Sequence, residues 1–131
     1  MSYGMTTTLD RPFDEVVTDV RDALAAQGFG IVSEIDMQAT LRTKLGVDIP
    51  RQIILGACNP AFAHRSLQED PSIGLLLPCN IVVRDTDSGT VVEMIDPQVL
   101  VSVTEHPGMQ QIANEVSEGL AAAMDAVRTS A

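Results

Sequence analysis

The sequence predicts a single α+β domain, residues 1–131, with one mixed, largely antiparallel sheet of about five strands and helices mainly on one face. Three observations predict this class. The 131 residues have the size of one domain, and no linker or internal repeat divides them. Hydrophobic residues make up 45% of the chain, which is enough for a core. Segments of strand-like and helix-like periodicity alternate, with βαβ-like spacing early and a hairpin late.

The strands are predicted from alternating side chains and from turn signals. Alternate residues from Tyr3 to Leu9 share one face of the first strand. The third strand is apolar on both faces, which is typical of an inner strand. An apolar run ending at Pro78 leads into the fourth, and a turn at 87–89 joins it to the fifth. The predicted strands are residues 3–9, 29–35, 52–57, 80–84 and 90–95.

The first two helices are bounded by capping residues and glycines. Pro12 suits the first turn of the first helix. Gly28 ends that helix, and Phe29 is placed to fold back over its end. Asp36 can cap a short second helix, which Gly46 closes.

The remaining helices show a different start signal and a long apolar stripe. Asn59-Pro60 and Asp96-Pro97 each join a capping residue to a first-turn proline. The helices that they open run to about residues 69 and 103. The last helix carries its apolar residues on one face, namely Met109, Ile112, Ala113, Val116, Leu120, Met124 and Val127.

The charge of the chain excludes some partners. It has 18 acidic and 8 basic residues, a net charge of −10, which phosphate backbones and anionic lipids repel. We therefore expect neither nucleic acid nor a membrane surface as a partner. No segment approaches the roughly 20 apolar residues of a membrane span, and the first residues do not resemble a signal peptide. Two cysteines cannot form a dense disulfide framework, so we expect a cytoplasmic protein with reduced thiols.

Six short motifs occur in a fixed order along nearly the whole chain. They are Pro12-Phe13, Gly28-Phe29-Gly30, Glu34-Ile35-Asp36, Leu55-Gly56-Ala57-Cys58-Asn59-Pro60, Leu76-Leu77-Pro78-Cys79-Asn80 and Asp96-Pro97. In this order and spacing, from residue 5 to about residue 127, the sequence resembles the bacterial and archaeal family known as domain of unknown function 302. The resemblance implies a small α+β domain that often forms a homodimer. It implies no established reaction, so no catalytic residue is carried over.

The candidate site is the edge at which both cysteines occur. Cys58 falls where an apolar strand ends and a helix begins, so unpaired N–H groups and the positive end of a helix should lie nearby. Cys79 falls at the start of a strand that could lie beside the first. A thiol in such a place can support thiolate chemistry or bind a metal. Alternatively, both cysteines are small packed hydrophobes, and Asn59 and Asn80 only cap or turn the backbone.

Basic residues gather around this edge. Residues 42–65 contain four basic residues and one acidic residue, so this window is +3 and the rest of the chain −13. A small anionic ligand near a helix N-terminus would suit this arrangement. Alternatively, the basic side chains pair with acidic neighbours in the fold. The predicted ligand-binding residues are Cys58, Asn59, Cys79, Asn80, Arg51 and Arg65.

Three functions stay open from the sequence. The first is a ligand- or anion-binding module whose ligand and cofactor the sequence does not name. The second is a thiol- or metal-dependent enzyme that uses Cys58, with His64 as a conceivable base. No metal site is predicted, because the compact spacing of zinc ligands is absent. The sequence also lacks the phosphate-binding loops and the nucleophile elbow of known enzyme families. The third is a structural interaction domain.

A homodimer is also predicted from the expected apolar surfaces. A sheet covered mainly on one side, together with alanines and methionines on the last helix, would leave apolar surface on a lone monomer. A symmetric two-fold dimer would bury that surface.

Overall fold

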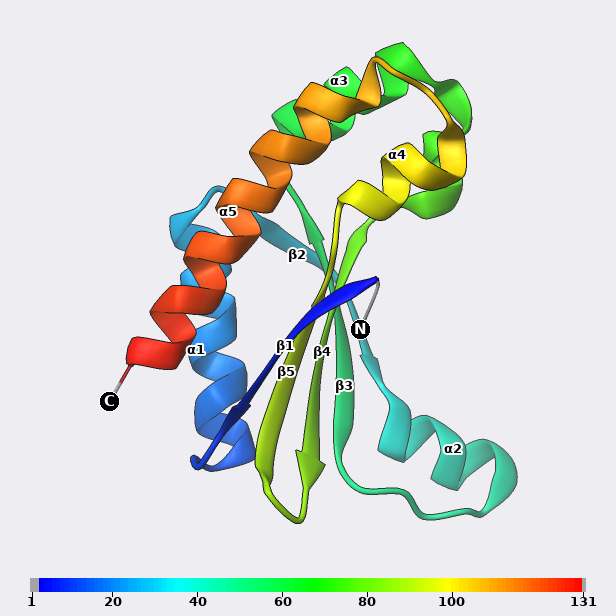
Figure 1. Ribbon diagram of the computed structural model, residues 1–131. Helices are drawn as coiled ribbons and strands as arrows, with labels where there is room; N and C mark the ends of the chain where they lie inside the picture. The colour runs from blue at the N-terminus through cyan, green and yellow to red at the C-terminus, as the bar shows by residue number, and fades with distance from the viewer. Residues whose placement is uncertain (1–2, 131) are drawn as a thin grey trace.

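The computed structural model describes residues 3–130 as one five-stranded sheet accompanied by helices (Figure 1). The strands are β1 (Gly4–Leu9), β2 (Gly30–Asp36), β3 (Gln52–Cys58), β4 (Cys79–Thr86) and β5 (Gly89–Ile95). The helices are α1 (Phe13–Ala26), α2 (Met37–Leu45), α3 (Pro60–Glu69), the 3₁₀ helix η1 (Pro71–Leu76), α4 (Gln98–Thr104) and α5 (Met109–Thr129). The predicted α+β class is confirmed.

The strand order is β1-β5-β4-β3-β2, and each pairing among residues 3–130 is antiparallel. A mixed sheet was expected from the βαβ-like spacing of the first elements, and that detail is wrong. The reason is that α1 carries the chain from β1 at one edge to β2 at the opposite edge. The two strands run in the same direction but never pair, because three antiparallel strands separate them. The prediction of β3 as an inner strand is confirmed.

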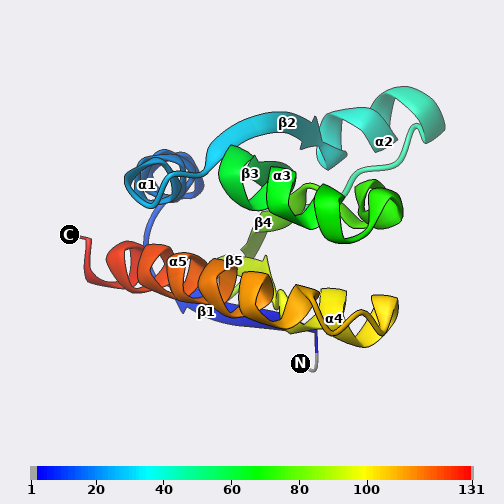
Figure 2. The ribbon, with the colours of Figure 1, turned by 90° about the horizontal axis from the view of Figure 1, so that it is seen from above.

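The two faces of the sheet differ in what covers them. Cross-strand pairs such as Ile81 with Met94 and Val83 with Val92 are buried beneath α1 and α5. The alternate residues of the same strands point to the other face. Figures 1 and 2 show α1 on one side of the sheet and α2 on the other, beyond β2. The main core therefore lies between one sheet face and the two long helices.

The end of α1 folds as its glycine predicts. Gly28 has a φ of +83°, and the N–H of Phe29 donates to the carbonyl of Leu24 at 2.9 Å. This left-handed turn reverses the chain and buries the ring of Phe29 against α5. At the other end, Pro12 caps the helix instead of occupying its first turn, a shift of one residue.

The boundaries of α2 also agree with the sequence. The Asp36 carboxylate accepts a hydrogen bond from the N–H of Ala39 at 3.0 Å, and Gly46 closes the helix with a φ of +67°. Yet none of the nine residues of α2 is buried. The features that define α2 are thus its local caps, because tertiary packing buries none of its residues.

Two segments between the main elements differ from the prediction. The apolar run before Pro78 forms η1, which Asp70 caps by accepting from the N–H of Ser72 at 3.0 Å. Helix α4 begins at Gln98 instead of Pro97, and the Asp96 carboxylate accepts from the N–H of Gln98 at 3.0 Å. Between residues 3 and 130, none of the helices has the length and hydropathy needed to cross a membrane.

Candidate functional site

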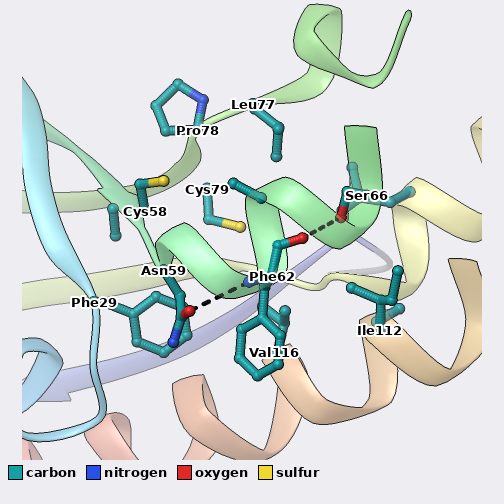
Figure 3. Close-up of a pocket in the computed structure, with 14 residues that line it drawn as sticks. Phe29, Cys58, Asn59, Phe62, Ser66, Leu77, Pro78, Cys79, Ile112 and Val116 are labelled. Carbon is teal, nitrogen blue, oxygen red and sulfur yellow. Dashed lines mark hydrogen bonds between the residues drawn. The ribbon is translucent and has the colours of Figure 1, made fainter. Parts of the chain in front are cut away.

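A small pocket lies where the end of β3 and the start of β4 meet α3 and α5 (Figure 3). Its volume is about 30 Å³, which is room for a group of only a few atoms. Most of its wall is apolar and comes from elements far apart in the sequence. The wall includes Phe29, Phe62, Leu77, Ile112 and Val116. Both cysteines line the pocket, as does Asn59.

The two cysteines occupy consecutive positions across β3 and β4. Cys79 pairs with Ala57 in the antiparallel register, which places Cys58 one residue further along. The prediction that the thiols are near neighbours is therefore confirmed. Because side chains alternate along a strand, the two thiols project to opposite faces of the sheet. In Figure 3 the sulfur of Cys79 points toward the helix that carries Phe62, whereas that of Cys58 lies on the side of Pro78.

Cys79 is a packed residue of the core. Its side chain is 8% exposed, and burial raises the pKa of its thiol to about 11, with a smaller contribution from the Cys58 thiol. At neutral pH it therefore stays protonated and is a poor nucleophile. Cys58 is only partly buried, and both cysteines are free. Cys58 is accordingly the more accessible thiol, but it projects to the sheet face opposite the pocket wall of α3 and α5.

The first turn of α3 is closed by its own cap. Asn59 Oδ1 accepts from the N–H groups of Ala61 and Phe62, at 3.1 and 3.3 Å. Pro60 has no N–H, and the N–H of Ala63 donates to the carbonyl of Asn59 at 2.9 Å. The donors that an anion would use at this helix N-terminus are thus already bonded within the chain. This local geometry favours a structural role for Asn59.

The predicted arginines do not converge on the cysteines. Arg51 precedes β3 and lies at the opposite end of that seven-residue strand from Cys58, roughly 20 Å away. There it stacks on Phe13 at 4.2 Å and pairs with Asp14 at 2.7 Å. The hydrogen bond from Arg51 lowers the pKa of the Asp14 carboxyl. The basic window of the sequence is therefore divided in space.

Arg65 connects two helices instead of pointing into the pocket. Its guanidinium pairs with Glu115 of α5 at 2.7 Å, and this contact lowers the pKa of the Glu115 carboxyl. Asn80 is exposed, pairs with Gly56 and alternates with Cys79, so it projects to the face away from the buried thiol. Of the six predicted site residues, the structure gathers Cys58, Asn59 and Cys79 and places Asn80 and the two arginines elsewhere.

Other residues of the pocket were missed by sequence reasoning. Ser66 is 3% exposed, and its hydroxyl donates to the carbonyl of Phe62 at 2.8 Å, so its polar group is satisfied within α3. The spacing of residues 59, 62, 63 and 66 is that of one helical face. The sequence signal that could have identified these pocket residues is this helical spacing in α3, together with the apolar stripe of α5 that it faces.

The histidines and acidic residues form no metal site in the described part of the chain. Among residues 3–130, no group of three or more possible ligand side chains lies together. His64 is exposed on α3 and is not part of the pocket wall. His106 lies 3.7 Å from Glu69, at the loop between α4 and α5. Neither arrangement supplies a base beside Cys58.

Comparison with known proteins agrees with the fold and with the motifs. Residues 5–127 match the family described as Domain of unknown function DUF302. The structure is similar to the crystal structure of an uncharacterized conserved DUF302 protein from Bacillus stearothermophilus, with a TM-score of 0.90 and 29% sequence identity. That similarity covers 98% of this chain and 100% of the other. No curated protein matches the sequence.

Proposed function

Because the chain belongs to the DUF302 family, whose description names no activity, we propose its function from its pocket. The protein is a small-ligand-binding module, and its ligand inserts an apolar group between α3, α5 and the Cys58/Cys79 edge of the sheet. The observation that carries this proposal is the apolar wall of that pocket, which combines side chains from five separate parts of the chain. Ligand sites are commonly concave and apolar, with few polar groups.

The polar groups around the pocket support an apolar ligand group over an anion. Ser66 and Asn59 already use their side-chain oxygens in hydrogen bonds within α3. Cys79 is neutral at neutral pH because burial raises its pKa to about 11. The Asn59 NH₂ group is the one side-chain N–H donor in the described pocket wall, which is little to offset the free-energy cost of placing an anion among such neighbours. The anion-binding form of the sequence prediction is therefore the weaker one.

The size of the pocket sets the size of the group that it can accept. About 30 Å³ suits a methyl or ethyl group, whereas apolar cavities that bind a benzene-sized ligand measure about 150 Å³. A longer alkyl chain requires α3 to move outward. Ser66 is the single fully buried residue of α3, although the helix also holds the partly buried ring of Phe62 against the core. Helix α5 has many more buried residues, so we propose α3 as the movable wall.

A thiol-dependent reaction at Cys58 is the second candidate. Cys58 borders the pocket and is partly exposed, whereas Cys79 is buried. Because the Cys58 thiol projects to the sheet face opposite α3 and α5, a reacting ligand must reach it from that face. A reaction needs the ligand to present an electrophile or a disulfide to that thiol. The binding proposal requires no such group.

The proposed function can be tested with n-hexanol as an apolar probe. We expect saturable shifts of the amide signals and of the side-chain methyl signals of pocket residues such as Ala57 and Val116 when the probe is bound. Ala63→Leu, which fills the pocket from α3, should abolish these shifts. Ala61→Leu, on the exposed side of the same helix, is the matched control and should retain them.

Two results would count against it. Shifts that do not saturate, or that persist unchanged in Ala63→Leu, would show that the probe binds elsewhere. Rapid alkylation of native Cys58 by iodoacetamide, without any saturable shift from n-hexanol, would favour the thiol-dependent candidate.

A further inference from the structure

Two contacts between charged side chains connect α3 to α5 and to the loop before it. Arg65 of α3 pairs with Glu115 of α5 at 2.7 Å, and one turn later Glu69 lies 3.7 Å from Nδ1 of His106. Figure 2 shows the two helices side by side, and the order of the contacts makes them antiparallel. The part of α3 that lines the pocket ends at Ser66, one turn before Glu69. The second contact is therefore placed to restrain the wall that we propose to be movable.

The carboxylate of Glu69 lies at the N-terminal end of α5. It packs against Gly108, the residue that precedes the helix, and a Cβ at this position would collide with Oε2 of Glu69. Gly108 has no side chain to cap α5, so the carboxylate faces the positive end of a 21-residue helix, which favours a negative charge. The glycine thus leaves the room that lets α3 reach this end of α5.

The backbone of His106 is fixed by the tight loop between α4 and α5. Glu105 ends α4 with a φ of +52°, a left-handed conformation that is uncommon for a residue with a side chain. The N–H of His106 donates to Oγ1 of Thr104 at 3.3 Å, and its carbonyl accepts from the N–H of Met109 at 3.0 Å. The position of His106 is therefore set by α4 and α5, whereas that of Glu69 is set by α3.

The nitrogen that faces Glu69 has no hydrogen bond of its own. Within residues 3–130, Nδ1 of His106 is buried and without a partner, and at 3.7 Å the carboxylate is too far for a hydrogen bond. A protonated imidazole carries a proton on this nitrogen and attracts the carboxylate, whereas a neutral imidazole protonated on Nε2 turns a lone pair toward it. The strength of the contact therefore depends on the charge of His106.

Few other charges act on His106. Glu69 is the one acidic residue in the described part of the chain with an oxygen within 4 Å of its ring nitrogens. Helix α4, η1 and the first six residues of α5 contain no charged residue. The other titratable or charged residues of α3 and of the adjoining loops are His64, Arg65, Asp70 and Glu105. Among residues 3–130 none of these four pairs with His106, so Glu69 is its main electrostatic partner.

We propose that Glu69 and His106 form a proton-dependent latch that controls how far α3 opens the pocket, a regulation that rests on the proposed function. With His106 protonated, the pair holds α3 against the start of α5, and the pocket accepts only a small apolar group. With His106 neutral, the contact is weak, and α3 moves outward for a longer alkyl chain. The pair of Arg65 with Glu115 stays charged in both states and keeps the helix docked.

Binding of n-hexanol at about pH 5.5 and about pH 8 tests the latch through the ligand. Histidine side chains titrate between these values, whereas carboxylates and guanidinium groups keep their charge. The wild type should bind n-hexanol about two- to fivefold more weakly at the lower pH, the effect expected of one partly exposed ion pair. His106→Gln should remove this difference and bind at both pH values as the wild type does at the higher one. His64→Gln changes the other histidine, which is exposed on α3, and should keep the difference.

Hydrogen exchange of the α3 amides tests the latch without any ligand. Their protection factors, which correct for the intrinsic effect of pH on exchange, should be about two- to fivefold higher at the lower pH in the wild type. His106→Gln and Glu69→Gln should each abolish this difference, and His64→Gln should retain it.

The two measurements separate the latch from the proposed function. If n-hexanol binds at neither pH while the exchange difference is present and lost in His106→Gln, the latch is supported and the proposed ligand class is rejected. Equal protection of α3 at both pH values in the wild type would overturn the latch, even if n-hexanol binds. So would a difference that His64→Gln removes and His106→Gln retains.

Discussion

The ring of Phe29 packs directly on the backbone of Gly119, so closely that a Cβ at Gly119 would lie 2.9 Å from ring atom Cε2. This contact joins the turn after α1 to the middle of α5 and holds one wall of the pocket in place. Phe29 is 3% exposed and cannot swing away, whereas an exposed side chain could. The glycine of α5 is thus a packing requirement of the aromatic ring opposite it.

We therefore expect Gly119→Ala to destabilise the protein. Alanine favours a helix by about 1 kcal/mol over glycine, but overpacking a core typically costs about 1–3 kcal/mol. The net loss in unfolding free energy should be measurable by urea denaturation. In a Phe29→Leu background the clash is relieved, so the same substitution should be neutral or stabilising. Equal destabilisation in both backgrounds would contradict this explanation.

The buried thiol of Cys79 should make stability depend on alkaline pH. Its pKa rises from about 9 to about 11 in the folded state, so the fold holds the proton more tightly than the unfolded chain does. The resulting stabilisation is complete below pH 9 and is lost as the pH rises through 11. Two pKa units correspond to about 2–3 kcal/mol.

Urea midpoints measured between pH 8 and 11 would show this loss. Cys79→Ala should flatten the curve in that window, whereas Cys58→Ala, which keeps the buried thiol, should not. Iodoacetamide at neutral pH should label Cys58 alone in the native protein. Labelling of Cys79 before unfolding would contradict its burial.

The cap of α3 should contribute more to stability than an ordinary surface asparagine. Asn59→Ala removes the acceptor of two N–H groups at the pocket and should cost about 0.5–2 kcal/mol of unfolding free energy. Asn80→Ala is the matched control, because Asn80 is exposed on β4. Thermal unfolding of both variants checks the difference. Equal melting temperatures would show that the cap is dispensable.

Two exposed ion pairs should be visible in carboxyl titrations. The hydrogen bonds from Arg51 and Arg65 lower the pKa values of Asp14 and Glu115 respectively. Arg51→Gln should raise the NMR titration midpoint of Asp14 and leave that of Glu115 unchanged, and Arg65→Gln should do the reverse. Each pair favours the fold above the ordinary carboxyl pKa and loses this effect as the pH falls through the lowered value. Midpoints that shift together, or not at all, would contradict the pairings.

The parts of the fold that were predictable depend on residues near one another in the chain. Asp36 with Gly46, and Asn59 with Pro60, mark helix ends through local hydrogen bonds and backbone geometry, and the structure places them as expected. The pairing of strands depends on distant segments. Nothing local to β1 and β2 indicates that three strands come between them, which is why a mixed sheet was expected. Similarly, nothing in the apolar run before Pro78 predicts that it forms a 3₁₀ helix.

The candidate site divides in the same way. Cys58 and Cys79 both lie at ends of apolar strands, and strand ends in one sheet meet, so their proximity was predictable. Closeness in sequence to Cys58 did not predict where the arginines lie. Each residue of a strand adds about 3.3 Å of distance, so a residue several positions before Cys58 on β3 lies far from it in space. Arg51 therefore ends beside Phe13, at the far end of β3. Ser66 is polar and was not expected in a pocket wall, but it satisfies its own hydroxyl within α3.

The position of β1 at one edge of the sheet has a consequence for synthesis on the ribosome. The hydrogen-bonding partner of β1 is β5, and Gly4 lies opposite Ile95. The strand β1 therefore stays unpaired until the ribosome has synthesised β5. The apolar face of α1 stays uncovered for longer, because α5, which packs against it, follows β5 and α4 in the sequence. A nascent chain therefore shows an unpaired strand and an uncovered apolar helix for most of its synthesis. Completion of the fold is a late and concerted event, and chains cut short before α5 should be prone to aggregate and to be degraded.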